Sequence, residues 1–233
     1  MNITDPESRI MKTAKGHLQG YNAQAAASED RIILSAEVTQ DCNDKKQLLP
    51  MLKRTKENLA AADRTHRMGT LLADAGYFSR KNLELADSAG PELLVAVSSE
   101  WKTMGRRTGG GAPSSSPQSP AQDMEEKLRS PGGKELYRKR GITIEPIFGH
   151  IKEVLGFRRF MRRGLEACGN EWKLMCMAHN LLKLWRYGID KVHKTADALV
   201  MVEERERGAI VKSGVWVIRR RSCLIGPIHE FRP

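Results

Sequence analysis

The order of apolar runs between residues 20 and 97 constrains the fold of this chain more than any other feature. Residues 20–27 and 31–39 flank the turn Ser28-Glu29-Asp30, which predicts a hairpin whose second strand is largely buried. A helix to about residue 62, with Asn43-Asp44 as its N-cap, a strand over 69–73, a helix over 79–89 and a strand over 93–97 are expected to follow. The order predicts an α/β fold, a mixed sheet with flanking helices.

A second, helical part is predicted beyond a stretch of Gly, Ser and Pro over about residues 105–120, which is typical of a flexible loop. The first helix of this part carries an apolar stripe formed by Ile144, Ile147, Phe148, Ile151 and Leu155. The second helix, over about 171–186, is expected to face the core through Leu174, Ala178, Leu181, Leu182 and Trp185. In the tail, residues 187–233, a helix is expected near 196–207 and a strand over 214–218.

Charge and cysteine usage limit the classes of function. The chain has 233 residues, 39 of them Lys or Arg against 28 Asp or Glu, for a formal net charge of +11. This balance favours nucleic acid as a partner, although many basic proteins bind none. The four cysteines form neither a CxxC motif nor a dense pattern, and no apolar segment has the length of a leader or membrane span. We therefore expect a cytoplasmic protein without disulfides.

Two carboxylates are candidates for chemistry. Asp74 follows a buried strand directly, and Glu145 is expected in the first turn of a helix. Carboxylate oxygens are ligands that Mg²⁺ prefers, and two such ions can activate the attacking oxygen and stabilise the leaving oxygen of a phosphoryl transfer. The alternative is structural: an Asp at a strand end is often a cap, and a Glu at a helix start stabilises the helix dipole.

Basic side chains follow Glu145 closely. Gly149 and Lys152 are expected on the same helical face as Glu145, while Tyr137 and Arg140 lie upstream, where they could contact phosphate. Arg158, Arg159, Arg162 and Arg163 then form a basic segment interleaved with aromatic residues. Such a segment suits a DNA backbone, and a solvated charged turn is the alternative.

These motifs, taken together, resemble a known family. The segments TDPESRIMK, QGYNAQAA, LLADAGYFS, IEPIFGHIKEVLGFRRFMRRGLEA and EWKLMCMAHNLLKLWR occur in that order. Over about residues 3–186 the chain is similar to the catalytic domain of insertion-sequence transposases of the IS4/IS5-like superfamily, most closely its IS1182-type branch. The resemblance implies a ribonuclease-H-like domain over residues 1–186, followed by a charged tail over 187–233.

The resemblance also implies roles for particular residues. Members of this family use an Asp, Asp, Glu triad with two Mg²⁺ or Mn²⁺ ions to cut DNA ends and join them to a target. Asp74 matches the second acid and metal ligand, and Glu145 matches the third. The associated Tyr, Arg, Glu, Lys signature falls on Tyr137, Arg140, Glu145 and Lys152. The spacing between Arg140 and Glu145 is one residue longer than in the commonest pattern of the superfamily. Double-stranded DNA is then the expected partner, and a homodimer is a further expectation.

The first acid of the triad has no match in the sequence. In the family it lies on a first strand upstream of the TDPESR segment, so we expect a truncated copy whose sheet is incomplete at that strand. Asp5 is the nearest substitute, yet its place before Pro6 favours a turn or cap. Three alternatives stay open: an active strand transferase, a DNA-binding remnant that cannot cut, and a fragment that does not fold. Cys168, Cys176 and His179 lack zinc-ligand spacing, and core packing is expected for Trp172, His179, Asn180 and Trp185.

Overall fold

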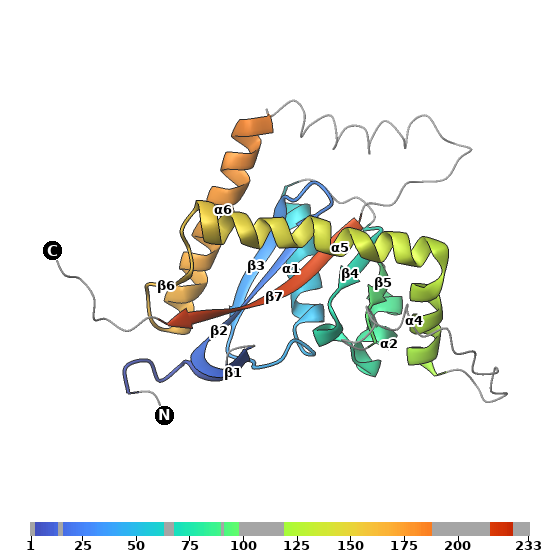
Figure 1. Ribbon diagram of the computed structural model, residues 1–233, viewed down its shortest axis with the longest axis horizontal. Coiled ribbons are helices and arrows are strands. Elements are labelled where there is room, and N and C mark those ends of the chain that lie inside the picture. The colour runs from blue at the N-terminus through green and yellow to red at the C-terminus, as the bar shows by residue number, and fades with distance from the viewer. Residues whose placement is uncertain are drawn as a thin grey trace.

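The computed structural model describes residues 3–13, 16–62, 68–89, 91–97, 119–187 and 215–225 (Figure 1). For residues 215–225 the backbone alone is described. The loop expected over 105–120 therefore lies outside the described residues up to 118, and so does the helix expected over 196–207. No helix among the described residues is long and apolar enough to cross a membrane.

A seven-stranded mixed sheet forms the centre of the fold. Its main path runs β1-β2-β7-β4-β5, with β3 paired to β2 and β6 paired to β7. β2 is antiparallel to β1, β3 and β7, whereas β4 is parallel to both β5 and β7. The strands are β1 Arg9–Thr13, β2 Gly16–Ser28, β3 Ile33–Thr39, β4 Thr70–Ala73, β5 Glu92–Val95, β6 Arg159–Phe160 and β7 Val215–Ile225.

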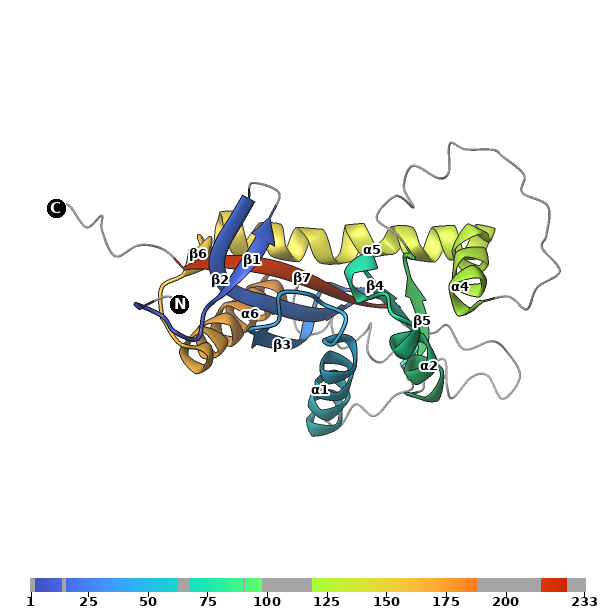
Figure 2. The same cartoon turned by 90° about the horizontal axis from the view of Figure 1, so that it is seen from below.

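Helices cover the sheet on both faces. α5 runs across one face and α1 lies on the other, as the two views show (Figures 1 and 2). α6 packs against β3, and α4 packs against α5 and β5. The helices are α1 Leu48–Ala61, the 3₁₀ turn η1 Ala75–Tyr77, α2 Arg80–Ala89, α4 Pro120–Arg129, α5 Pro131–Gly149, the π turn η2 His150–Val154 and α6 Leu165–Tyr187.

The prediction that Glu145 lies in the first turn of its helix is wrong, because α5 begins at Pro131. Ser130 caps the helix by accepting the Gly133 N–H, and Pro131 takes the first helical position, where its missing N–H costs nothing. Gly133 permits a tight contact: a Cβ there would lie 1.9 Å from the Lys127 carbonyl oxygen. Glu145 is therefore near the C-terminal end of α5.

The N-cap predicted at Asn43-Asp44 is also wrong. α1 begins at Leu48, and its N-cap residue is Gln47, whose side chain makes no capping bond. Asp44 is instead buried, and its Oδ1 accepts hydrogen bonds from the side-chain amides of Asn22 and Gln24 on β2, at 2.9 Å each. The carboxylate thus holds the loop before α1 against the middle of β2.

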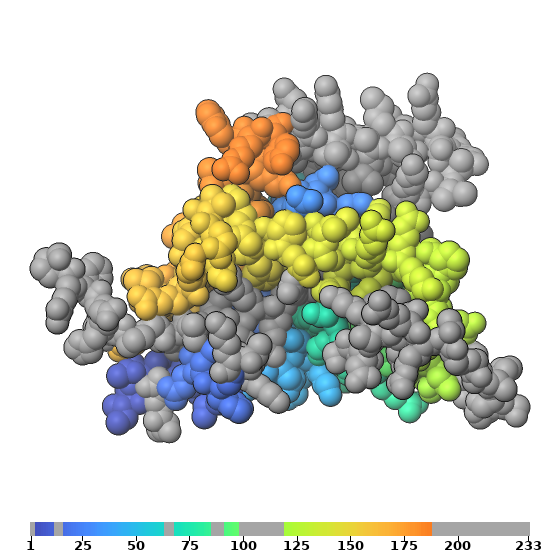
Figure 3. Space-filling view, viewed as in Figure 1, coloured from blue at the N-terminus to red at the C-terminus, as the bar shows by residue number. Residues whose placement is uncertain are grey.

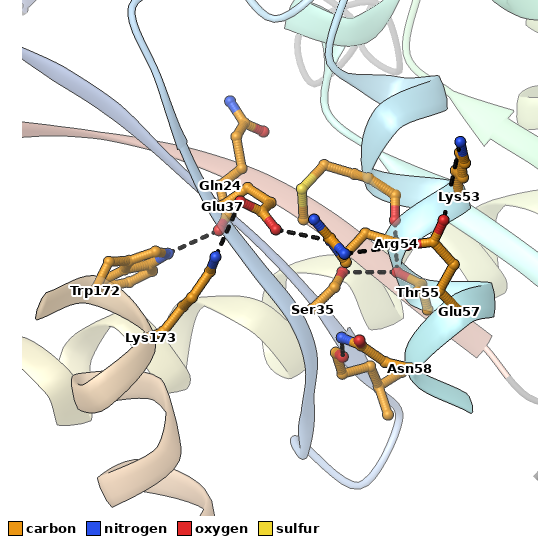
Figure 4. Close-up of polar contacts among 12 residues, drawn as sticks. Gln24, Ser35, Glu37, Lys53, Arg54, Thr55, Glu57, Asn58, Trp172 and Lys173 are labelled. Carbon is orange, nitrogen blue, oxygen red and sulfur yellow. Dashed lines mark hydrogen bonds and ion pairs between the residues drawn. The ribbon is translucent and has the colours of Figure 1, made fainter. Parts of the chain in front are cut away.

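Polar contacts fasten α1 and α6 to β3 (Figure 4). Glu37 of β3 lies between the two helices, 2.9 Å from Arg54 of α1 and 3.5 Å from Lys173 of α6. Asn58 donates a 2.7 Å hydrogen bond to the Leu34 carbonyl, and Asn180 pairs with both backbone groups of Ile33. Among the described strands β3 pairs with β2 alone, and these amides satisfy backbone groups along its other edge and so protect that edge.

The buried face of α6 differs from the predicted one. Its buried residues are Cys168, Trp172, Cys176 and His179, which confirms core packing for Trp172 and His179. The side chain of Trp172 stacks on Phe148 and Phe157. The face predicted to meet the core is largely exposed, and Trp185 is 87% exposed. Both stripes have helical spacing, and the aromatic neighbours of Trp172 decide which one is buried.

Most of the strands expected from sequence are present. The hairpin corresponds to β2 and β3, with β1 as an additional strand, and the strands predicted over 69–73 and 93–97 correspond to β4 and β5. The strand expected over 214–218 extends to Ile225 as β7 and pairs within the same sheet. The sheet therefore includes residues from both sides of the boundary expected at residue 186.

Candidate functional site

Asp74 lies where the sequence predicted it, directly after β4. The four residues of β4 are all buried and fix the strand in the core. Asp74 then caps η1, since its Oδ1 accepts the Ala75 N–H at 3.0 Å. Its other oxygen, Oδ2, is 3.5 Å from Nη1 of Arg140 on α5. The capping role and the ion pair both use the carboxylate, which is 46% exposed.

Tyr137 and Arg140 connect α5 to the end of β4. The Tyr137 hydroxyl donates a 3.2 Å hydrogen bond to the Ala73 carbonyl, and Arg140 lies over the Tyr137 ring with its Cζ 5.4 Å from the centroid. Burial raises the pKa of Tyr137; the positive charge of Arg140 opposes this shift and the negative charge of Asp74 adds to it. The hydroxyl therefore stays protonated and serves as a donor at neutral pH.

Arg140 is buried with incomplete hydrogen bonding. Its side chain is only 7% exposed. Nε and Nη1 have no hydrogen-bond partner among the described residues, and the 3.5 Å contact with Asp74 is too long for a strong hydrogen bond. Unsatisfied buried donors are costly, which makes this guanidinium a candidate for binding an anion.

A cavity of about 660 Å³ runs along α5 and brings three predicted site residues together. In the space-filling view, α5 and η2 form a ridge across this face of the molecule (Figure 3). Glu145 is five positions after Arg140, which places the two residues about 140° apart around the helix and about 7.5 Å apart along its axis. Glu145 is accordingly on an exposed side of α5. The cavity is lined by Lys134, Tyr137, Arg138, Arg140, Gly141, Ile142, Glu145 and Pro146.

The described residues do not match the ligand set of a two-metal site. Two ions that share a phosphoryl group require several converging carboxylates. Asp74 has the Arg140 guanidinium as its charged neighbour. In the part of the chain that the structure describes, no group of three or more His, Cys, Asp or Glu side chains could hold a metal ion. Metal binding by Asp74 and Glu145 stays a prediction.

Asp5, the nearest candidate for the first acid of the triad, makes structural contacts. It is 2% exposed, and its Oδ1 accepts a 2.8 Å hydrogen bond from the Tyr21 hydroxyl of β2. Its Oδ2 accepts the Gly164 N–H at 3.3 Å. Burial, followed by the hydrogen bond and charge of Asp5, raises the pKa of Tyr21. The expected turn role is thus extended: Asp5 ties the N-terminal segment to β2 and to the turn before α6.

Lys152 lies apart from the cavity. It belongs to η2, whose wider π turn interrupts the α-helical period that would place it on the same face as Glu145 and Gly149. Its Nζ is 3.4 Å from Glu153, and its side chain is 46% exposed. The structure thus brings Tyr137, Arg140 and Glu145 to one cavity and leaves Lys152 on the surface beyond it.

The basic segment, residues 158–163, is held rigidly although its side chains are largely exposed. The carboxylate of Glu171 on α6 accepts the backbone N–H groups of Met161 and Arg162 at 3.1 to 3.2 Å. Glu7 accepts the Leu165 N–H at 2.7 Å. Arg158, Arg159 and Arg162 are exposed, Arg163 is half-buried, and Arg158 pairs with Glu153. The sequence indicated the arginines, but the acids that anchor them are distant in sequence and carried no local signal.

A second cavity, of about 440 Å³, lies between β3, α1 and α6, and none of the predicted site residues lines it. Comparison with known protein families gives a match over most of the chain. Residues 3–181 match the family model described as a transposase DDE domain, a range that includes Asp74, Tyr137, Arg140, Glu145 and Lys152. No curated protein and no solved structure shows significant similarity to the chain.

Proposed function

Because the chain belongs to the transposase DDE domain family, we propose that it binds double-stranded DNA of a mobile element and that it does not cut DNA through Asp74 and Glu145. The family implies a DNA substrate and generally uses divalent metal ions. We further propose that the domain is ribonuclease-H-like and that the chain belongs to the IS1182-type branch of the family. The observed mixed sheet is compatible with this fold. A homodimer stays a prediction.

The observation that carries the proposal is the anchored basic segment. Glu171 accepts the backbone N–H groups of Met161 and Arg162, and Glu7 accepts the N–H of Leu165 just after the segment, so the backbone here needs little further ordering when the guanidinium groups meet phosphates. Arginine forms bidentate hydrogen bonds with phosphate oxygens. Arg159 also lies on β6, where it pairs with Leu224 of β7. β7 is the central strand, and it thus connects the basic segment to the part of the sheet that lies near the cavity along α5.

A second candidate is the family activity itself, metal-dependent strand cleavage and transfer. Two observations favour this activity. Asp74 is the ion-pair partner of Arg140, and Glu145 lines the same cavity as Arg140. The Asp74–Arg140 pair weighs against it, because a guanidinium competes with a cation for the same carboxylate oxygen.

One assay separates the two candidates. A fluorescently labelled duplex is titrated with the chain at several salt concentrations, with EDTA or with Mg²⁺ or Mn²⁺, and each sample is then run on a denaturing gel. We expect salt-sensitive binding and an intact duplex, because cationic side chains that bind phosphates release counterions. The double variant Arg159→Gln/Arg162→Gln should reduce the slope of log K against log salt by about 0.9 for each phosphate that the variant no longer neutralises.

The matched control removes the same number of positive charges from α1. Lys53→Gln/Lys56→Gln on α1 should leave the slope close to that of the parent chain, since both lysines are exposed on α1. Absence of duplex binding at low salt would overturn the proposal. Metal-dependent cutting that is abolished in both Asp74→Ala and Glu145→Ala would establish the second candidate.

A further inference from the structure

α6 presents an apolar face that no other described element covers. Its side chains Leu174, Met177, Leu181 and Trp185 are 52%, 53%, 57% and 87% exposed. They recur at i, i+3, i+7 and i+11, which places them within about 80° of arc around the helix. Trp172, which packs in the core, lies on the opposite side of the helix. The last turns of α6 also project beyond the sheet (Figure 1).

The area of this face is large for a surface that stays in water. From their exposed fractions the four side chains present roughly 600 Å² of surface, which is the upper end of the largest apolar patches on monomeric proteins, about 300–600 Å². If the same face of a second copy covered it, the contact would bury about 1,200 Å² in total, which is where the range of stable interfaces begins. Two copies thus have enough apolar area for a reversible dimer.

The face also lacks charge, in a chain whose formal net charge is +11. Between Leu174 and Trp185 the only Lys, Arg, Asp or Glu is Lys183, about 160° around the helix from Leu181. DNA is bound through cationic groups, which this face does not offer. Two molecules of like charge can meet here without setting charges against each other. The face therefore fits a second copy of the chain better than it fits a nucleic acid.

The cavity of about 440 Å³ between β3, α1 and α6 borders this face. Met177 and Leu181 line the cavity and also belong to the apolar stripe, while Glu37 and Arg54 are polar residues of its wall. Interfaces commonly combine an apolar centre with a polar rim. The surface beside the stripe is thus hollowed, and it offers space to side chains of a second molecule.

We propose that α6 is a dimerisation helix, whose face of Leu174, Met177, Leu181 and Trp185 packs on the same face of a second copy. A two-fold dimer uses one surface twice, so an uncharged apolar stripe is complementary to itself. Trp185 is the expected anchor, because tryptophan is among the residue types that contribute most to the energy of interfaces. The inference goes beyond the proposed DNA binding and does not depend on it.

The test is the mass of the protein in solution. Sedimentation velocity is recorded over the micromolar concentration range, in EDTA, on chain freed of nucleic acid. We expect a monomer–dimer equilibrium with a dissociation constant in the micromolar range, the weak end for interfaces of standard size. Leu181→Glu should raise this constant on the order of 100-fold, because a two-fold interface buries the introduced carboxylate twice. Leu181→Met should leave it nearly unchanged, because the side chain stays apolar.

Val154→Glu on η2 is the matched control. Val154 is 59% exposed, close to the 57% of Leu181, and lies outside the stripe. The same introduced charge should leave the dimer intact at this position. Salt is a second control, because salt does not weaken the burial of apolar surface but does weaken contacts with DNA. The dimer should therefore persist at a salt concentration that abolishes duplex binding.

Three results would overturn the inference. A chain that stays monomeric and loses stability in Leu181→Glu has this face covered by its own residues 188–214. A monomer whose stability is unchanged in Leu181→Glu has no occupant for the face. A dimer that Leu181→Glu and Val154→Glu weaken equally uses another surface.

Two further measurements keep these outcomes distinct. Circular dichroism of each variant identifies loss of folding. If Leu181→Glu does not fold, Met177→Gln is a milder change on the same face and should weaken the dimer about tenfold. A chain that dimerises but binds no duplex would refute the proposed function and leave this inference standing.

Discussion

At the scale of single residues, a histidine pair makes the packing of α6 sensitive to pH. The Nε2 of His179 is 3.2 Å from the Arg31 carbonyl oxygen, which can only accept, so Nε2 carries the proton. Its Nδ1 must then accept from His150 Nδ1, 3.1 Å away. A second proton on His179 would set two N–H groups against each other. Burial lowers the pKa of both histidines below 6.5, with His150 and Lys183 adding to the effect at His179 and Arg186 at His150.

The sign of the pH effect follows from proton binding. Below pH 6.5 the histidines of the unfolded chain bind protons, whereas the buried histidines of the folded chain stay neutral. The contribution of the neutral histidine pair to the free energy of unfolding is therefore complete above pH 6.5 and is lost as the pH falls toward the folded pKa values. The free energy of unfolding should fall by at most about 1.4 kcal/mol per proton and pH unit. Urea titrations from pH 7.5 to 5 should show a flatter profile in His179→Gln than in the parent or in His17→Gln, an exposed control. An unchanged profile in His179→Gln would refute this account of the pair.

At the scale of elements, α6 carries two tryptophans with opposite environments. Trp172 is fully buried, stacks on Phe148 at 5.8 Å between ring centroids, and donates from Nε1 to the Gln24 carbonyl at 2.8 Å. Trp172→Ala should therefore cost about 3–5 kcal/mol of unfolding free energy. Trp185→Ala should change it by no more than about 0.5 kcal/mol, because the side chain is 87% exposed. Equal destabilisation of the two variants in urea denaturation would show that the buried face of α6 is assigned wrongly.

What could be predicted from sequence also differs between elements. β4 and Asp74 were predictable because a short apolar run ends in a residue type that caps turns. The start of α5 was missed because Gly132, Gly133 and Gly141 weaken the helical pattern, and the fit of Gly133 against Lys127 depends on a neighbouring helix. Of the candidate site, the residue types were found from motifs, whereas burial and pairing of Arg140 depend on residues distant in sequence.

At the scale of the whole molecule, β7 decides whether the chain has one continuous sheet. The local pattern predicted only the beginning of this strand, over 214–218, and not its central place in the sheet, because three arginines in its middle are unfavourable for a central strand and its neighbours β2 and β4 lie about 150 to 200 residues away. The account of the fold depends on this strand, since it joins the antiparallel and the parallel parts of the sheet. Its central position is therefore the claim to test most directly.

The measurement is a disulfide between register partners. Ala26 and Ile218 face each other across β2 and β7, and partners in antiparallel strands have Cα atoms about 4.5–5.5 Å apart, within the range of a disulfide. After mild oxidation, peptide mass mapping of Ala26→Cys/Ile218→Cys should find the bond between these positions. The off-register control, Ala26→Cys/Arg221→Cys, is displaced by about 10 Å along the strand and should not form it. Absence of the 26–218 bond, or equal yield in the control, would contradict the central position of β7.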